Sequence, residues 1–232
     1  EDTFCLVGER INEPRVVFIT GGNRGIGAAI AERFAQAGDR VVIGHRTTNP
    51  PDFSARITSI NVDVRDSATL DSAFATIEGE LGPVEILINN AGIFGPLPFV
   101  ENIQKQRFGT VDLDVWADVL RVNTLGTINV TEALVDNIAA SDKKMIVTLS
   151  SGAGSIGGSD RPAMAYTTSK AALNKAMTIV ARTLQDRDIV VAIMCPGYVR
   201  TRMGLGGGDV DVDESVAGLR SLISGFTMSD SG

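Results

Sequence analysis

The sequence predicts one α/β domain in which a parallel β-sheet carries helices on both faces. Short apolar runs of strand length alternate along the chain with longer segments of helical periodicity. The runs are continuously apolar, which is typical of strands buried on both faces of a parallel sheet. A glycine-rich segment separates the first run from the first helical segment. Together these features predict a doubly wound sheet of the Rossmann type with the strand order 3-2-1-4-5-6.

The individual elements follow from local patterns. Runs rich in valine and isoleucine predict the strands, while a cap at Ser67 and a stop at Gly38 help to delimit two of the helices. The expected strands cover residues 16–20, 40–44, 57–64, 84–89, 145–150 and 190–195. The expected helices cover residues 26–37, 67–81, 114–140, 163–186 and 213–224.

Composition bounds the class of protein. The 232-residue chain is 44% apolar and carries a net charge of −7, which suits one domain with a large core. An acidic surface does not attract the negative charges of nucleic acid or of an anionic membrane, so neither is expected as a partner. No apolar run is long enough to span a bilayer, and no signal-peptide pattern opens the chain. Cys5 and Cys195 make no disulfide framework, so a cytoplasmic location is expected.

The single histidine of the chain, His45, limits the available chemistry. Because there is one histidine, a two-histidine zinc site is excluded, and no metal is expected. His45 itself is expected in a loop that flanks a bound cofactor, so a Ser-His-Asp triad is excluded as well. Any acid–base catalyst must therefore be a Tyr, Lys, Asp, Glu or Cys side chain.

Residues 20–27 (TGGNRGIG) join the first strand to the first helix. Glycines let the backbone turn sharply and approach a pyrophosphate closely, and the helix start offers free N–H groups to its phosphates. A plain glycine turn is the alternative, although glycines in the first helical turn would then weaken the helix without benefit. The candidate phosphate-binding residues are Gly21, Asn23, Arg24, Gly25, Ile26 and Gly27.

The end of the second strand indicates which dinucleotide would bind. NAD sites usually place an acid there for the ribose hydroxyls, but this chain has His45 and Arg46 instead. Arg46 could pair with a 2′-phosphate, with Arg24 reaching it from the glycine loop. This favours NADP(H), with NAD(H) as the alternative cofactor; Arg46 could otherwise be a solvated loop charge.

Small and polar residues end the next two strands. Asp63 and Val64 close the third strand, where an adenine ring would lie. Asn89, Ala91 and Gly92 close the fourth, and their small size allows close approach of ribose and nicotinamide. Asn89 could equally satisfy backbone groups at the strand end.

Tyr166 and Lys170 are predicted on one face of a helix because they are four residues apart. An ammonium close to the phenol would lower its pKa and suit it to proton transfer. Ser151 follows the fifth strand at the sheet edge where ligands bind, and its hydroxyl could donate to a substrate oxygen. Asn123, inside a helical pattern, is expected to bend that helix and hold a water that feeds Lys170, or to be a satisfied helix asparagine.

With these motifs in place, residues 16–224 resemble the short-chain dehydrogenase/reductase family. The resemblance implies an Asn-Ser-Tyr-Lys catalytic tetrad, with Tyr166 as acid–base, Ser151 as donor to the substrate oxygen and Lys170 also as ribose anchor. It further implies a segment that closes over the nicotinamide. The residues that carry it are 20–27, 89–92, Asn123, Ser151, Tyr166, Lys170, Pro196, Gly197, Val199 and Thr201.

Subfamily signals are mixed. The first half is similar to NADPH-dependent 3-oxoacyl-(acyl carrier protein) reductases, and the second half to C-factor and sniffer-type carbonyl reductases. These similarities imply hydride transfer between NADP(H) and a small carbonyl or alcohol substrate, in a homodimer or homotetramer. A signalling protein of the C-factor type, which binds the nucleotide without needing turnover, is the alternative.

Three departures from the family pattern carry expectations of their own. Ser151 lies fifteen residues before Tyr166, two more than is usual, so Ser150 or Ser155 could be the donor instead. The usual final strand is not recognised, which leaves a seventh strand in doubt. Residues 1–14 are expected to be an extension, and residues 15–232 to form the NADP(H)-binding domain with the catalytic and substrate site.

Overall fold

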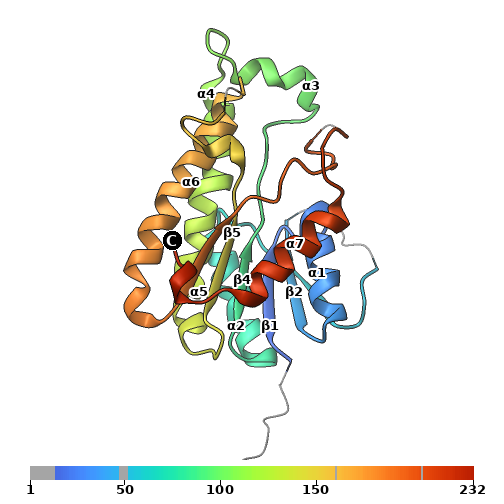
Figure 1. Cartoon of the computed structure of the whole chain (residues 1–232), viewed down its shortest axis with the longest axis vertical. Helices are drawn as coiled ribbons and strands as arrows, with labels where there is room; N and C mark the ends of the chain where they lie inside the picture. The colour runs from blue at the N-terminus through green and yellow to red at the C-terminus, as the bar shows by residue number, and fades with distance from the viewer. Residues whose placement is uncertain (1–13, 47–51, 160, 205) are drawn as a thin grey trace, which may run out of the picture.

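The computed structural model describes residues 14–46, 52–159, 161–204 and 206–232, so the expected N-terminal extension lies outside the described residues apart from Pro14. Its centre is one parallel sheet of six strands in the order β3-β2-β1-β4-β5-β6, which confirms the predicted topology (Figure 1). β3 and β4 are shorter than predicted. The strands are β1 Val16–Thr20, β2 Arg40–His45, β3 Ile57–Asn61, β4 Ile86–Asn89, β5 Met145–Leu149 and β6 Val190–Met194.

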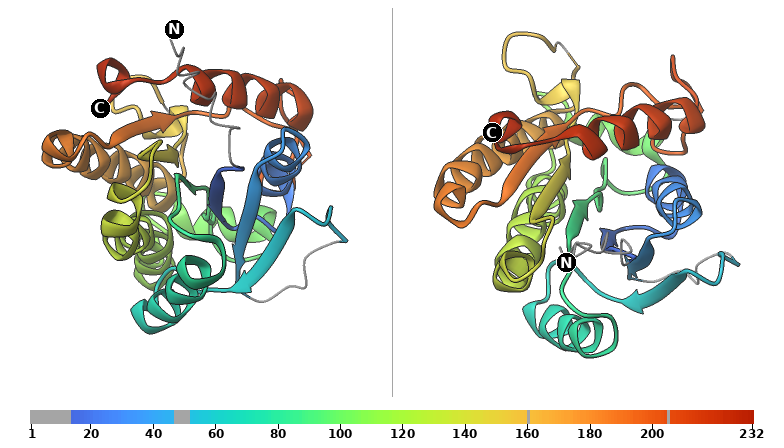
Figure 2. Two further views of the ribbon diagram at one scale, coloured as in Figure 1. Left: turned by 90° about the horizontal axis from the view of Figure 1, so that it is seen from below. Right: turned by 60° about the horizontal axis from the view of Figure 1, so that its bottom comes forward.

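Helices cover both faces of the sheet, which explains why the central strands β1, β4 and β5 are buried along their whole length, whereas the edge strand β3 is partly polar and exposed. Successive side chains of a strand point to opposite faces. Val16 and Phe18 therefore enter one core with helices α2, α5 and α6, whereas Val17 and Ile19 enter a second core with α1 and α7. The two groups of helices lie on opposite sides of the sheet (Figure 2). The bounds of these helices are α1 Gly25–Gln36, α2 Ser67–Leu81, α5 Gly126–Ala139, α6 Met164–Thr183 and α7 Val212–Gly225.

The long helix predicted at 114–140 contains an irregular turn. It comprises α4 (Leu113–Leu120), a π-helical turn at Arg121–Leu125 and α5. The predicted bending residue, Asn123, lies inside this turn. Two short helices before it, α3 (Phe99–Asn102) and a 3₁₀ turn at Ile103–Gln106, were not predicted.

The remaining helical elements are short 3₁₀ turns at Gly152–Gly154, Gln185–Arg187 and Met228–Asp230. Beyond the last of these, Gly232 donates its N–H to the carbonyl of Val191 (3.0 Å), and the Ser231 hydroxyl accepts from the Val191 N–H (3.0 Å). The described residues thus cover the outer edge of β6 without adding a seventh strand. None of their helices has the length and hydropathy needed to cross a bilayer.

Candidate active site

A cavity of about 1310 Å³ opens at the carboxyl ends of the strands. In a doubly wound sheet, the position between β1 and β4 is where the chain reverses its winding direction and ligands bind. Two predicted site residues, Asn89 and Asn123, are not part of the cavity wall. The others all line it: Gly21, Asn23, Arg24, Gly25, Ile26, Gly27, Arg46, Asp63, Val64, Ala91, Gly92, Ser151, Tyr166, Lys170, Pro196, Gly197, Val199 and Thr201.

The glycine loop is shaped by close packing as well as by backbone freedom. Helix α1 begins at Gly25, whose φ of +54° favours glycine, and no side chain caps this helix end. A Cβ at Gly27 would lie 2.4 Å from Nδ2 of Asn90 and 2.5 Å from the carbonyl oxygen of Gly21. The backbone around Gly27 is therefore packed too tightly for any side chain at that position. The uncapped start of α1 lines the cavity, so its free N–H groups are available to a ligand there.

Thr20 and Asn90 join the glycine loop to the loop after β4, and the sequence analysis did not single out either residue. The Nδ2 of Asn90 donates to the carbonyls of Thr20 (2.9 Å) and Gly21 (3.0 Å). In return, Oγ1 of Thr20 accepts from the backbone N–H groups of Asn90 and Ala91, both at 3.0 Å. We call these four bonds the loop brace. The pair Asn89-Asn90 at the end of β4 is the sequence feature from which they could have been predicted.

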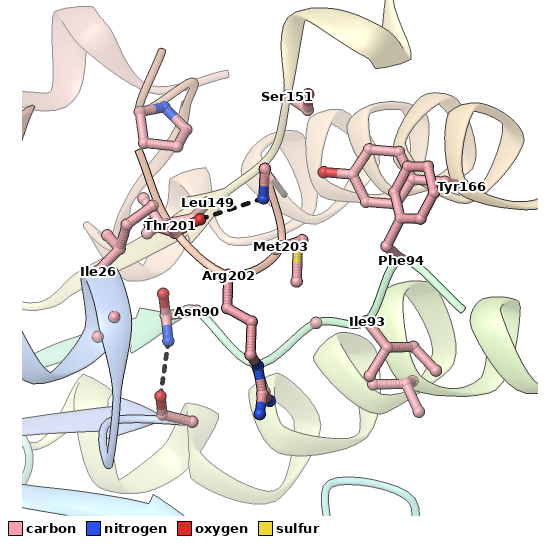
Figure 3. A pocket seen from close by; sticks show the side chains of 18 of the residues that line it. Ile26, Asn90, Ile93, Phe94, Leu149, Ser151, Tyr166, Thr201, Arg202 and Met203 are labelled. Carbon is pink, nitrogen blue, oxygen red and sulfur yellow. Dashed lines mark hydrogen bonds between the residues drawn. The ribbon is translucent and has the colours of Figure 1, made fainter. Parts of the chain in front are cut away.

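Three arginines approach one another in the same half of the cavity, although the chain as a whole is acidic. Burial and the charges of Arg202 and Arg46 lower the pKa of Arg24. Arg202 extends from the loop after β6 into the cavity (Figure 3). Arg46 lies 3.8 Å from Asp63, whose carboxylate is held by Arg65 at 2.7 Å. The hydrogen bond from Arg65 holds the pKa of Asp63 below its usual value.

Tyr166 and Lys170 occupy successive turns at the start of α6, which begins at Met164. The buried Nζ of Lys170 donates to the carbonyl of Leu149 at the end of β5 (2.9 Å), the bond drawn in Figure 3. Burial lowers the pKa of Lys170 to about 8. The ammonium form therefore still predominates at neutral pH, and its charge is anchored between α6 and β5.

The environment of Tyr166 differs from the expectation. Burial raises the pKa of its phenol, while a hydrogen bond with the Ser151 side chain and the charge of Arg161 act in the opposite direction. The expected lowering of this pKa by Lys170 is not among these influences. Beside it, the ring of Phe94 packs at a centroid distance of 5.0 Å (Figure 3). Without bound ligands, the phenol thus keeps its proton at neutral pH.

The geometry distinguishes the three candidate serines. The hydroxyl of Ser150 donates to Oδ1 of Asn174, which turns it toward α6. Oγ of Ser155 accepts from the N–H of Gly158 (3.1 Å), and Ser155 is not part of the cavity wall. Ser150 and Ser151 both line the cavity, but of the three serines only Ser151 is among the influences on the pKa of Tyr166.

The two predicted asparagines that lie behind the wall have structural partners instead. The alternation along β4 turns Asn89 toward α5, where its Nδ2 donates to Oγ1 of Thr131 (3.1 Å). The fully buried Asn123 accepts from the N–H of Ile93 and donates to its carbonyl, both at 2.8 Å, and also donates to Ser169 (3.0 Å). Its side chain therefore fixes the start of a cavity loop, which agrees with the expected alternative of a satisfied helix asparagine, and the water beside Lys170 stays a prediction.

Beyond Tyr166 the cavity wall is mostly apolar and comes mainly from the loop and short helices after β4, which the sequence analysis left unassigned. Phe94 and Phe99 pack edge to face at 5.8 Å. Val100 remains 68% exposed although it lines the cavity. The apolar residues of this part are Ile93, Phe94, Leu97, Phe99, Val100, Ile103 and Met203.

Comparison with known proteins adds a family match. A family model described as short chain dehydrogenase matches residues 15–206. The chain is 31% identical over 189 residues to a 3-oxoacyl-acyl-carrier-protein reductase, MabA, of Mycobacterium avium, covering 82% of this chain and 69% of the relative.

Solved structures agree with this match. Carbonyl reductase Sniffer of D. melanogaster superposes with a TM-score of 0.79 at 25% identity, covering 94% of both chains. A short-chain dehydrogenase/reductase from Burkholderia multivorans with bound NADP superposes with a TM-score of 0.79 at 26% identity, covering 94% of this chain and 93% of that one. None of these proteins is named as a signalling protein, so the C-factor alternative gains no support.

Proposed function

The chain belongs to the short-chain dehydrogenase family of oxidoreductases, and from this premise we propose that it reduces a carbonyl compound to an alcohol with NADPH as the hydride donor. The observation that carries the proposal is the meeting of Tyr166, Ser151 and Lys170 in one cavity with the uncapped start of α1. A module that only binds a nucleotide would not need a tyrosine, a serine and a lysine together in the wall of the same cavity.

Each of the three side chains has a role in this reaction. When bound, the nicotinamide supplies the hydride that adds to the carbonyl carbon. Tyr166 donates its phenolic proton to the carbonyl oxygen, and Ser151 donates a hydrogen bond to that same oxygen. A raised pKa suits Tyr166 to giving a proton, which is the reductive direction. Lys170, whose Nζ is held by the carbonyl of Leu149, would anchor the ribose of the cofactor, the role that the family resemblance implies.

The cavity also fits a phosphorylated dinucleotide. Because Gly27 has no Cβ, the start of α1 can pack closely against Gly21 and Asn90, and a pyrophosphate can approach the N–H groups there. Arg46 follows β2, where a 2′-phosphate would lie, with Arg24 and Arg202 close by. The NADP bound by the Burkholderia relative supports this preference over NAD(H).

The test is Tyr166→Phe, which removes one oxygen but keeps the ring that packs against Phe94. NADPH oxidation with a panel of aldehydes and ketones should fall by roughly a hundredfold or more, because proton donation is lost. NADPH binding, followed by nicotinamide fluorescence, should be unchanged. Equal turnover by the variant and the wild type would refute the role of Tyr166.

The remaining part of the proposal concerns assembly. We take residues 15–232 as one catalytic unit that forms a homodimer or homotetramer. Leu125 beside α5 and Ile179 on α6 are 60% and 52% exposed, so both helical segments leave large apolar side chains for a second copy. Light scattering in solution measures the mass, and a monomer at micromolar concentration would contradict this assembly.

A further inference from the structure

We propose that Arg161 and Tyr198 form an anion subsite at the reacting end of the cavity, and that the substrate is a small carbonyl compound that also carries a carboxylate. The inference rests on the proposed function and names its substrate class. It assigns Arg161 as the residue that selects acids over their neutral analogues.

The subsite is formed by two loops that meet over the cavity. Arg161 lies shortly before α6, and Tyr198 follows β6; both line the cavity. The guanidinium carbon of Arg161 is 4.8 Å from the centroid of the Tyr198 ring, a cation–π contact. The Tyr198 hydroxyl in turn donates to the carbonyl of Gly204 (3.3 Å). Stacking on one face leaves the edge of the guanidinium, with its N–H donors, open to a ligand.

The charge of Arg161 has no acidic partner within the part of the chain that the structure describes. Arg200, another arginine of the cavity wall, shows the contrast: it pairs with Asp211 at 2.8 Å and donates to the carbonyl of Gly208 at 2.8 Å. Arg200 is thus committed to holding its own loop. No described residue accepts a hydrogen bond from the guanidinium of Arg161, which lines the cavity. A guanidinium in this situation can bind a planar carboxylate through a bidentate pair of hydrogen bonds.

Position separates this cation from the arginines proposed for the cofactor. Arg24, Arg46 and Arg202 gather near the glycine loop, whereas Arg161 lies just before α6, which carries Tyr166, and stacks on Tyr198 in the same cavity wall. An anion held by Arg161 therefore belongs to the molecule that Tyr166 protonates.

That position also decides which anion fits. A 3-oxoacyl group on an acyl carrier is attached through a pantetheine arm, and the phosphate of that arm lies the whole length of the arm away from the thioester carbonyl. In a small oxo acid, by contrast, the carboxylate lies near the carbonyl. Phe94, Phe99 and Val100 line the same region and would contact an apolar body. An oxo acid with an apolar side chain matches both the cation and these contacts.

The experiment compares matched acid and ester substrates. Phenylglyoxylate and its methyl ester, and 4-carboxybenzaldehyde and its methyl ester, present the same carbonyl with and without the charge at two spacings. We expect kcat/KM to favour at least one acid over its ester by roughly tenfold to a hundredfold, the range for a charge-assisted hydrogen bond. Arg161→Gln should remove this preference while retaining activity toward the esters.

Two sets of variants separate the subsite from general damage. Arg187→Gln removes an exposed arginine that pairs with Asp136 outside the cavity wall, and it should leave the acid preference intact. Tyr198→Phe keeps the stacked ring and should retain the acid preference, whereas Tyr198→Leu should lose part of it. Equal losses for acid and ester in Arg161→Gln, or a wild type that does not favour either acid, would overturn the proposal.

A binding measurement keeps this result apart from the proposed function. Calorimetric titration of phenylglyoxylate and 4-carboxybenzaldehyde into the NADPH-containing protein should show at least one of them binding about tenfold more weakly to Arg161→Gln, and more weakly still at high salt. If no carbonyl is reduced but this difference persists, the reductase proposal fails and the subsite stands. If both acids bind the variant and the wild type equally, the subsite fails whatever the activity.

Discussion

The cavity has two halves that are built in different ways. The cofactor half consists of residues 20–27, 44–46, 62–64 and 90–92, which are strand ends and the start of α1 joined by the loop brace. The substrate half consists of Tyr198, Met203 and the cavity-wall residues within 93–103 and 158–161 without 160, which belong to loops and short helices. In it, large apolar side chains such as Leu97 (56%) and Val100 (68%) remain exposed.

This difference shows where ligand specificity is encoded in the chain. In the cofactor half the backbone is the binding surface, so the sequence must supply small residues and hydrogen bonds that fix its course. In the substrate half the side chains form the binding surface, so a substitution there alters which ligand binds more readily than it alters the stability of the fold. Substitutions placed in each half, and at the junction between them, should therefore differ in what they damage.

The largest effect is expected at the junction of the halves. Burial lowers the pKa of Lys170 from 10.5 to about 8, so charging this amine costs free energy only in the folded protein. Between these pH values the unfolded chain holds a proton that the folded protein has released, so this contribution to the free energy of unfolding rises with pH. The total rise is on the order of 3 kcal/mol. Urea unfolding at pH 7.5 to 10.5 measures it.

Lys170→Met should abolish this part of the pH dependence, because the variant has no amine to deprotonate at that site. Lys175→Met is the matched control, since Lys175 lies on the same helix but is exposed. The wild-type profile should persist in the control. A profile that is the same in the Lys170 variant and the wild type would contradict the assignment.

The next effect is expected in the cofactor half. Gly27→Ala places a Cβ against Nδ2 of Asn90 and the carbonyl of Gly21, so it should destabilise the fold by about 1–3 kcal/mol and abolish NADPH binding. Gly79→Ala is the control, because nothing lies within 4 Å of a Cβ at that position in α2. It should raise the stability by about 0.5–1 kcal/mol. Thermal unfolding and fluorescence titration measure both quantities, and normal NADPH binding by Gly27→Ala would argue against the loop brace.

A smaller effect should distinguish the two dinucleotides. Arg46 is half exposed, so Arg46→Ala should weaken NADPH binding by about tenfold, while NADH binding changes little because that molecule lacks the 2′-phosphate. Titrating both cofactors into the variant and the wild type measures this. A uniform loss for NADPH and NADH would place Arg46 away from the 2′-phosphate.

The smallest effect is expected in the substrate half. Val100→Ser changes an exposed side chain, so the free energy of unfolding should shift by less than about 0.5 kcal/mol. Loss of apolar contact should raise KM for apolar carbonyls by about fivefold or less, with kcat nearly unchanged. Steady-state kinetics at saturating NADPH test it; a destabilisation above 1 kcal/mol would contradict the contrast between the halves.

The sequence was sufficient for most of the cofactor half and for little of the substrate half. The strand order and the phosphate loop follow from local features, namely apolar runs such as 16–20 and glycines at a strand-to-helix junction. The short helices at 99–106 escaped prediction because apolar residues such as Val100 stay exposed there and produce no amphipathic period.

The points that the sequence left open or predicted wrongly at the site have a common physical cause, which is contact between residues far apart in the chain. Asn123 binds the backbone of Ile93, thirty positions earlier, and Arg202 approaches Arg24 from the opposite end of the chain. No local pattern reports such contacts. The direction of the pKa shift of Tyr166 depends on burial by the folded chain in the same way.

The bonds of Asn90 and Thr20 have a thermodynamic consequence for ligand capture. They tie the glycine loop to the end of β4 before any nucleotide arrives, so conformational entropy that a loose loop would lose on binding is already lost during folding. Association should then proceed without a slow conformational phase, and its heat capacity change should reflect only the surfaces that meet.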